Sequence, residues 1–222
     1  MNIGALKGLH RNHILPPLMV VFVTAVLLLV YSLWVSRQQT IQAAETTVRN
    51  LAWLTEARWS ASLDRARASL DSLSGKVRPE AMQQANLHRY EQYLNAELAI
   101  EGKSFPEVKA FHVLAADGSL LYTSSVDDPW RFNMAEAPRF RRLREDPRLE
   151  IAYSGLMKHG ADEVASFMVL LPLRAGNGVF LGALAAQIDL AYFERLLSSL
   201  DVGTRGFLAI WRSDDFSLVL RR

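Results

Sequence analysis

The stretch Gly178-Val-Phe-Leu-Gly-Ala-Leu-Ala-Ala-Gln-Ile-Asp-Leu-Ala-Tyr-Phe-Glu-Arg195 holds a turn, an apolar run and a helix in that order. The run from Val179 to Leu190 reads as a strand, and the apolar spacing from Ala191 to Leu200 is helical. Before it, the turn sequence Ala175-Gly-Asn-Gly178 follows another apolar run, Ala165 to Arg174. The stretch therefore predicts a β-hairpin that leads into a helix.

Further hairpins are predicted on both sides of this one. Val108 to Ala115 reads as a strand, Asp117-Gly118 as a tight turn, and Ser119 to Ser124 as the antiparallel partner. Spacing also predicts a short helix at 136–145, a half-buried strand at 149–158, and strands at 205–212 and 216–220. Because hairpins follow one another while helices stand apart, the sequence predicts the α+β class with an antiparallel sheet.

Two helices are predicted before the first strand. Residues 38–74 contain no Pro or Gly, and their apolar residues recur at helical spacing; residues 79–100 form a second helical stretch. The C-terminal half of the first helix is expected to pack on the protein's own sheet. The half nearer the N-terminus carries Ile41, Val48 and Leu51, which predict contact with a second copy in a parallel homodimer.

The segment from Ile14 to Ser36 contains 23 residues without a charge. At about 1.5 Å per residue, this length crosses a hydrocarbon core of roughly 30 Å. The alternative is a cleaved signal peptide, whose apolar region is shorter. Lys7 and Arg11 precede the segment, so the positive-inside rule places residues 1–13 in the cytoplasm and residues 37–222 in the periplasm.

Composition and motifs exclude several classes of protein. The chain of 222 residues has 25 basic and 23 acidic side chains and no basic run, so it offers no surface for nucleic acid. It has no cysteine, which excludes disulfides and thiolate chemistry. The five histidines, His112 among them, show no metal-ligand spacing and are assigned structural or surface roles. Neither catalysis, nor a metal, nor a cofactor is expected from the residues present.

Four segments resemble the double Cache periplasmic sensor domains, also called PDC or PAS-like, of bacterial membrane signalling proteins. The segments are Val108 to Ser125, Ala137 to Phe140, Phe167 to Arg174, and Gly178 to Arg195, the most specific. They are most similar to the first Cache module of diguanylate cyclases and sensor histidine kinases. The resemblance implies a transmembrane helix at 14–36, a helical stalk and packing helices at 37–104, and a PAS-like sensor module at 105–222. Members of the family continue with a second module, a second membrane helix and a cytoplasmic output domain, so the resemblance suits an N-terminal portion of such a protein, a truncated reading frame or a relative without an output domain.

The resemblance also suggests a ligand site. Amino-acid-binding members of the family hold the ligand ammonium with an Asp at the end of the penultimate strand, a position that Asp189 matches. They hold its carboxylate with an Arg-x-Trp-Tyr segment, which Trp130 and Arg131 replace in a different order. An Arg fork and a Trp wall suit a small organic ligand such as an amino acid or a carboxylate. The other interpretation of Asp189 is a cap for the following helix.

Tyr122, Tyr153 and Met168 complete the predicted ligand-binding set, because they lie on strands that could line the pocket. Ordinary core packing is the alternative for each. We therefore expect a periplasmic ligand-sensing domain, anchored in the inner membrane, that passes a small shift down its long helix. The alternative is an anchored envelope protein whose domain is a protein-interaction or assembly module without ligand sensing.

Overall fold

The computed structural model describes residues 11–125, 133–159, 164–200, 206–211 and 218–221. Contacts divide the chain into two units, Met1–Leu54 and Thr55–Arg222. Helix α1, Arg11–Ser74, is continuous and contributes residues to both units. The predicted membrane segment and the predicted stalk are therefore parts of one helix.

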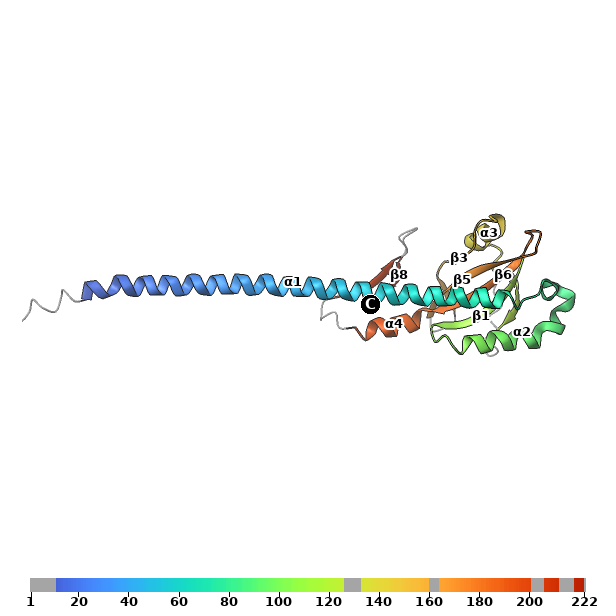
Figure 1. Cartoon of the computed structure of the whole chain (residues 1–222), viewed down its shortest axis with the longest axis horizontal. Helices are drawn as coiled ribbons and strands as arrows, with labels where there is room; N and C mark the ends of the chain where they lie inside the picture. The colour runs from blue at the N-terminus through green and yellow to red at the C-terminus, as the bar shows by residue number, and fades with distance from the viewer. Residues whose placement is uncertain (1–10, 126–132, 160–163, 201–205, 212–217, 222) are drawn as a thin grey trace, which may run out of the picture. The chain divides into compact units, whose positions relative to one another are not determined.

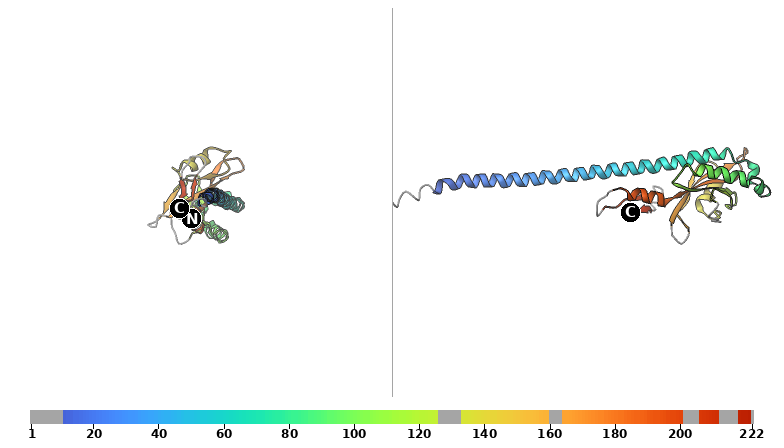
Figure 2. Two further views of the ribbon diagram at one scale, coloured as in Figure 1. Left: turned by 90° about the vertical axis from the view of Figure 1, so that its left-hand side faces the viewer. Right: turned by 90° about the horizontal axis from the view of Figure 1, so that it is seen from below.

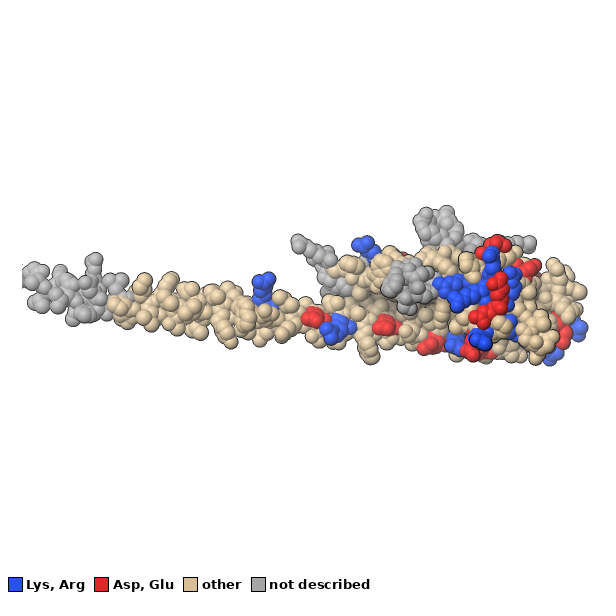
Figure 3. Space-filling view, turned by 90° about the horizontal axis from the view of Figure 1, so that it is seen from above, with Lys and Arg blue, Asp and Glu red and all other residues tan. Residues whose placement is uncertain are grey.

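In the first unit, the apolar side chains of α1 are exposed. Leu18, Phe22 and Leu29 are more than half exposed, residues 14–36 contain no charged side chain, and the face seen in Figure 3 is uncharged along this stretch. Among the described residues, α1 is the one helix long and apolar enough to cross a membrane, although a signal sequence shares these properties. Thr24 donates its hydroxyl to the Val20 carbonyl at 2.8 Å, so this polar group is satisfied within the helix.

The second helical stretch differs from its prediction. Two short 3-10 helices, η1 (Pro79–Met82) and η2 (Gln84–Asn86), come first, and α2 spans Leu87–Gly102. The prediction of one helix from residue 79 is wrong because Gln83, with φ −85° and ψ 133°, is extended and separates the two 3-10 turns.

The second unit contains an antiparallel sheet in the order β2-β1-β6-β5-β3, with β4 also paired to β5. Its strands are β1 (Val108–Ala115), β2 (Leu120–Thr123), β3 (Ala152–Tyr153), β4 (Met157–His159), β5 (Val164–Arg174) and β6 (Phe180–Asp189). Helix α3 (Pro138–Glu145) precedes β3, and α4 (Leu190–Ser198) follows β6. A separate two-stranded sheet pairs β7 (Ala209–Trp211) with β8 (Leu218–Arg221). The α+β class and the two central hairpins are confirmed.

The predicted strand at 149–158 is wrong in one respect, because two short strands, β3 and β4, replace it. Between them, the Ser154 N–H still donates to the Met168 carbonyl at 2.8 Å, but Ser154 Oγ accepts a hydrogen bond from the Met168 N–H at 2.8 Å, where a strand would use its backbone carbonyl. The chain leaves β5 here and returns to it at Met157.

Gly182 allows the close approach of β6 to β1. Its φ is 152°, and a Cβ added there would lie 2.0 Å from the Leu114 carbonyl oxygen. The interruption of the apolar strand by glycine therefore has a steric cause.

The two faces of the sheet are covered by different helices. The first face packs on α1, α2 and α4 in a core that contains Leu70, Leu98 and Phe193. The second face packs on α3 through Phe140 and Leu143. In Figures 1 and 2, α2 and the C-terminal part of α1 run side by side, and α3 lies on the other side of the sheet.

Candidate functional site

Four buried polar side chains gather on the second face of the sheet. His112, Ser154, Ser166 and Gln187, here called the polar cluster, are each at most 3% exposed. Each stands two residues from an apolar member of the second core, namely Leu114, Ala152, Met168 and Ala185. Because side chains alternate between the faces of a strand, the cluster lies on the face that α3 covers.

Hydrogen bonds and a close contact link His112, Gln187 and Ser166 of the polar cluster across β1, β6 and β5, whereas Ser154 bonds to backbone groups. The Gln187 amide nitrogen donates to Ser166 Oγ at 3.0 Å, and Gln187 Oε1 lies 3.3 Å from His112 Nε2. Ser154 Oγ accepts from the Met168 N–H and donates to the Gly155 carbonyl, both at 2.8 Å. Buried polar groups cost free energy unless they are bonded, and these bonds offset that cost for four polar side chains in an otherwise apolar sheet.

Asp189 lies at the edge of this cluster. It is paired with Ser166 in the β5–β6 register. Its Oδ1 accepts from the Ala191 N–H at 3.0 Å and caps α4, so the predicted capping role is confirmed. Its Oδ2 lies 3.8 Å from the exposed Arg195 guanidinium, and the Asp189 side chain is 22% exposed. One carboxylate oxygen therefore serves the helix, while the other has only a long contact to an exposed cation.

The other predicted site residues divide between the two faces. Met168 is fully buried beside the polar cluster. Tyr122 lies on the first face, where its hydroxyl donates to the Ala81 carbonyl at 2.7 Å. Burial raises the pKa of Tyr122, with a further contribution from Glu91, so its hydroxyl stays protonated as a donor. Tyr153 also packs on the first core.

The structure therefore brings together Asp189 and Met168 and separates them from Tyr122 and Tyr153. Trp130 and Arg131 lie outside the described residues. Ligand contact by any of these six residues stays a prediction.

Sequence reasoning missed all four members of the polar cluster. The available signal was a single polar residue inside an apolar run, as with His112 in Ala110-Phe-His-Val-Leu114 and Gln187 in Ala183-Leu-Ala-Ala-Gln-Ile188. Only the register of the strands places these residues on one face.

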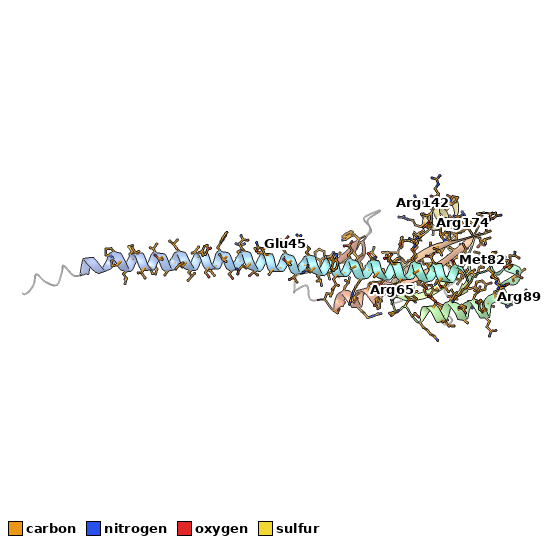
Figure 4. All side chains as sticks on the ribbon, viewed as in Figure 1. Glu45, Arg65, Met82, Arg89, Arg142 and Arg174 are labelled. Atoms are coloured by element: carbon orange, nitrogen blue, oxygen red, sulfur yellow. The ribbon has the colours of Figure 1, made fainter. Side chains whose placement is uncertain are left out.

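Arg174 holds α3 over the second face. Its Nη2 donates to the carbonyls of Leu143 at 2.8 Å and Asp146 at 3.1 Å, which lie at the C-terminal end of α3. Its guanidinium also stands over the Phe180 ring at 5.4 Å. Figure 4 shows Arg174 beneath α3, with Arg142 on the helix itself. A cation at a helix C-terminus satisfies free carbonyls, so Arg174 fixes where α3 ends.

No group of three or more His, Cys, Asp or Glu side chains that could hold a metal ion occurs within the described ranges. The polar cluster has one imidazole and no carboxylate of its own, which fits hydrogen bonding to an organic group better than coordination of a cation.

Comparison by sequence with protein-family models and with curated proteins finds no match. Comparison by structure finds several. The extracellular domain of the putative histidine kinase rpHK1S-Z16 matches with a TM-score of 0.61 and 21% identity, over 76% of this chain and 67% of that chain. The ligand-binding domain of the Pseudomonas aeruginosa PAO1 amino acid chemoreceptor PctC, in complex with GABA, matches with a TM-score of 0.54 and 15% identity. The match covers 79% of this chain and 74% of that chain.

A third similar structure is the ligand-binding domain of the Campylobacter jejuni chemoreceptor Tlp3 in complex with 4-methylisoleucine. It has a TM-score of 0.57 and 10% identity, over 79% of this chain and 70% of that chain. The chain spans a smaller share of others, 59% of the histidine kinase domain vpHK1S-Z8 and 25% of an extracellular receptor from Desulfohalobium retbaense. The chain therefore shares the fold of these extracellular and ligand-binding domains, which agrees with the fold that the resemblance predicted.

Proposed function

We propose that this chain is the extracytoplasmic ligand-sensing part of a membrane signalling protein. The observation that carries the proposal is the polar cluster, buried on the sheet face opposite the long helices and bordered by the Asp189 carboxylate. A sheet built only to fold would place apolar side chains at these positions, because a satisfied polar network adds little stability. Hydrogen-bonding groups beside a carboxylate suit recognition of a small polar molecule.

The ligand class that we propose is a small amino acid or a related carboxylate. Asp189 supplies a negative charge for an ammonium group, and hydroxyl, amide and imidazole groups lie next to it. Arg131 and Trp130 are the predicted partners of the ligand carboxylate. The GABA complex of PctC and the 4-methylisoleucine complex of Tlp3, which share this fold, support the class of ligand.

The same proposal assigns the parts of the chain. Ile14 to Ser36 crosses the bacterial inner membrane, residues 1–13 lie in the cytoplasm and residues 37–222 lie in the periplasm. Residues 37–104 form the stalk and packing helices, and 105–222 form the sensor module. The exposed, uncharged surface of α1 supports the crossing. Any output enzyme, such as a diguanylate cyclase or a histidine kinase, belongs to a full-length protein.

A parallel homodimer through α1 is part of this proposal. Ile41 is 50% exposed and Val48 is 63% exposed, and they are seven residues apart on one side of the helix. Because the chain has no cysteine, single substitutions report the contact directly. We expect Val48→Cys to form a disulfide-linked dimer in membranes, whereas the control Thr46→Cys, exposed on the opposite side of the helix, stays monomeric.

The proposal is tested by a thermal-shift screen of the full chain in detergent micelles. The compounds are the common amino acids, short organic acids and polyamines. We expect at least one compound to raise the melting temperature in a saturable way, and Ser166→Ala to weaken that effect. If no compound does so for a chain that melts cooperatively, ligand sensing by these residues is refuted.

A further inference from the structure

Glu107 is a buried residue with bonds in two directions. It stands directly before β1, and its side chain is 1% exposed. Its backbone carbonyl accepts a hydrogen bond from the Asp189 N–H at 2.9 Å. Its carboxylate Oε1 accepts a hydrogen bond from Nη2 of Arg65 on α1. One residue thus connects the edge of the polar cluster with the long helix.

The carboxylate of Glu107 is poorly compensated for a buried charge. Its Oε2 is buried and has no hydrogen-bond partner among the described residues. The Arg65 side chain is 57% exposed and also donates to Ser62 Oγ at 3.3 Å. A buried carboxylate with a single ionic partner adds little net stability, because desolvation offsets the attraction. Stability alone does not explain this pair.

A second ion pair on α1 lacks the connection to the site. Arg67 bonds to Glu150 at 3.0 Å, but both side chains are exposed, at 44% and 79%. Glu150 precedes β3, on the far edge of the sheet from β1. Figure 4 shows Arg65 on the part of α1 that lies along the sheet. The two pairs therefore provide a test and a matched control on one helix.

Asp189 is where a ligand would act on this connection. Its carboxylate caps α4 beside Ser166, while its N–H is bonded to Glu107. If a ligand draws the backbone of Asp189 toward it, the Glu107 carbonyl must follow or lose that bond. Because the Glu107 side chain is confined by burial, its movement is passed to Arg65 rather than absorbed by rotation.

We propose that Glu107 is a positioning residue that couples Asp189 to α1 through Arg65. The proposal rests on the proposed sensing function, since it describes how that site reaches the helix. Its test needs no ligand, so it can fail independently of that function.

The test measures amide hydrogen exchange in α1 peptides from residues 62–73, with the full chain in detergent micelles. Four chains are compared: the natural chain, Asp189→Ala, Glu107→Gln and the double variant. Asp189→Ala removes the cap that holds Asp189 on α4 and so loosens the backbone bond from Asp189 to Glu107, and we expect α1 exchange to become about two- to fivefold faster. In the Glu107→Gln background, we expect Asp189→Ala to speed α1 exchange by less than about 1.5-fold.

A merely structural role for Glu107 gives a different result. Glu107→Gln would then speed exchange by itself but leave the factor due to Asp189→Ala unchanged, and that outcome overturns the proposal. In the control background Arg67→Gln, Asp189→Ala should still speed α1 exchange by about two- to fivefold. Loss of that increase in the Arg67→Gln background would also overturn the proposal. If Glu107→Gln does not melt cooperatively, Arg65→Gln, which removes the same ion pair from the exposed side of α1 and matches Arg67→Gln, replaces it with the same expectations.

Discussion

Asp189 carries two separable roles, and two substitutions distinguish them. Asp189→Ala removes both the cap on the Ala191 N–H and the negative charge, whereas Asp189→Asn keeps a side-chain oxygen for the cap and removes only the charge. A lost cap costs about 1 kcal/mol, or about 2–4 °C in melting temperature for a domain of this size. The long contact to exposed Arg195 adds little, since exposed ion pairs are worth about 0–1 kcal/mol.

Thermal unfolding followed by circular dichroism should therefore show a decrease of about 2–4 °C for Asp189→Ala and less than about 1 °C for Asp189→Asn. Ligand binding should respond differently. A hydrogen bond to a charged group is worth about 1.5–3 kcal/mol, so both variants should bind the compound found by screening at least about tenfold more weakly. Unchanged binding by Asp189→Asn would refute ammonium recognition by Asp189, and unchanged stability of Asp189→Ala would refute the cap.

Three further predictions concern the sheet. Tyr122→Phe should lower the unfolding free energy by about 1–2 kcal/mol, measured by urea denaturation at neutral pH, because the Ala81 carbonyl loses a buried donor. Burial raises the pKa of Tyr122 above its usual 10.0. The stability that Tyr122 adds is therefore complete below that pH and is lost as the pH rises through the folded pKa. Tyr122→Phe should not show this loss of stability at alkaline pH. Gly182→Ala should lower the urea midpoint by at least the equivalent of about 1 kcal/mol, because the new methyl group meets the Leu114 carbonyl. The hydroxyl and N–H of Ser119 hold the pKa of Asp117 below its usual 3.8. The stability that Asp117 adds is therefore present above that pH and is lost as the pH falls through the folded pKa. Asp117→Asn should remove this acid dependence when unfolding is measured against pH.

Turn chemistry explains why the hairpins could be predicted. The turn at Asp117-Gly118 and the turn before Val179 use residues that accept the required backbone angles, and Gly118 and Gly178 have φ values of 81° and 84°. The break between β3 and β4 was not predictable, because it depends on the Ser154 hydroxyl replacing a ladder bond. Local patterns do not show such a tertiary contact.

The candidate site was predictable only in part, because strand register decides which face a side chain joins. A register shift between Val108 and Ala110 places Val108 in the first core and His112, four residues later, on the second face. Simple alternation would have given them the same face. Tyr122 is assigned to the opposite face for a related reason, since its partner Val113 belongs to the first core. Asp189 was singled out through the family resemblance, because it stands at the end of a strand that the sequence predicts, and its contact with a ligand stays a prediction.

The most direct test of the central claim compares the affinity of one screened compound for variants on the two faces, by calorimetry on the full chain. Gln187→Leu removes the centre of the polar cluster, and Tyr122→Phe is the control on the opposite face. We expect at least about a tenfold loss of affinity for Gln187→Leu, because buried polar partners are left unpaired, and less than about a twofold change for Tyr122→Phe. Equal effects from both faces, or full affinity in Gln187→Leu, would contradict a ligand site on the polar cluster.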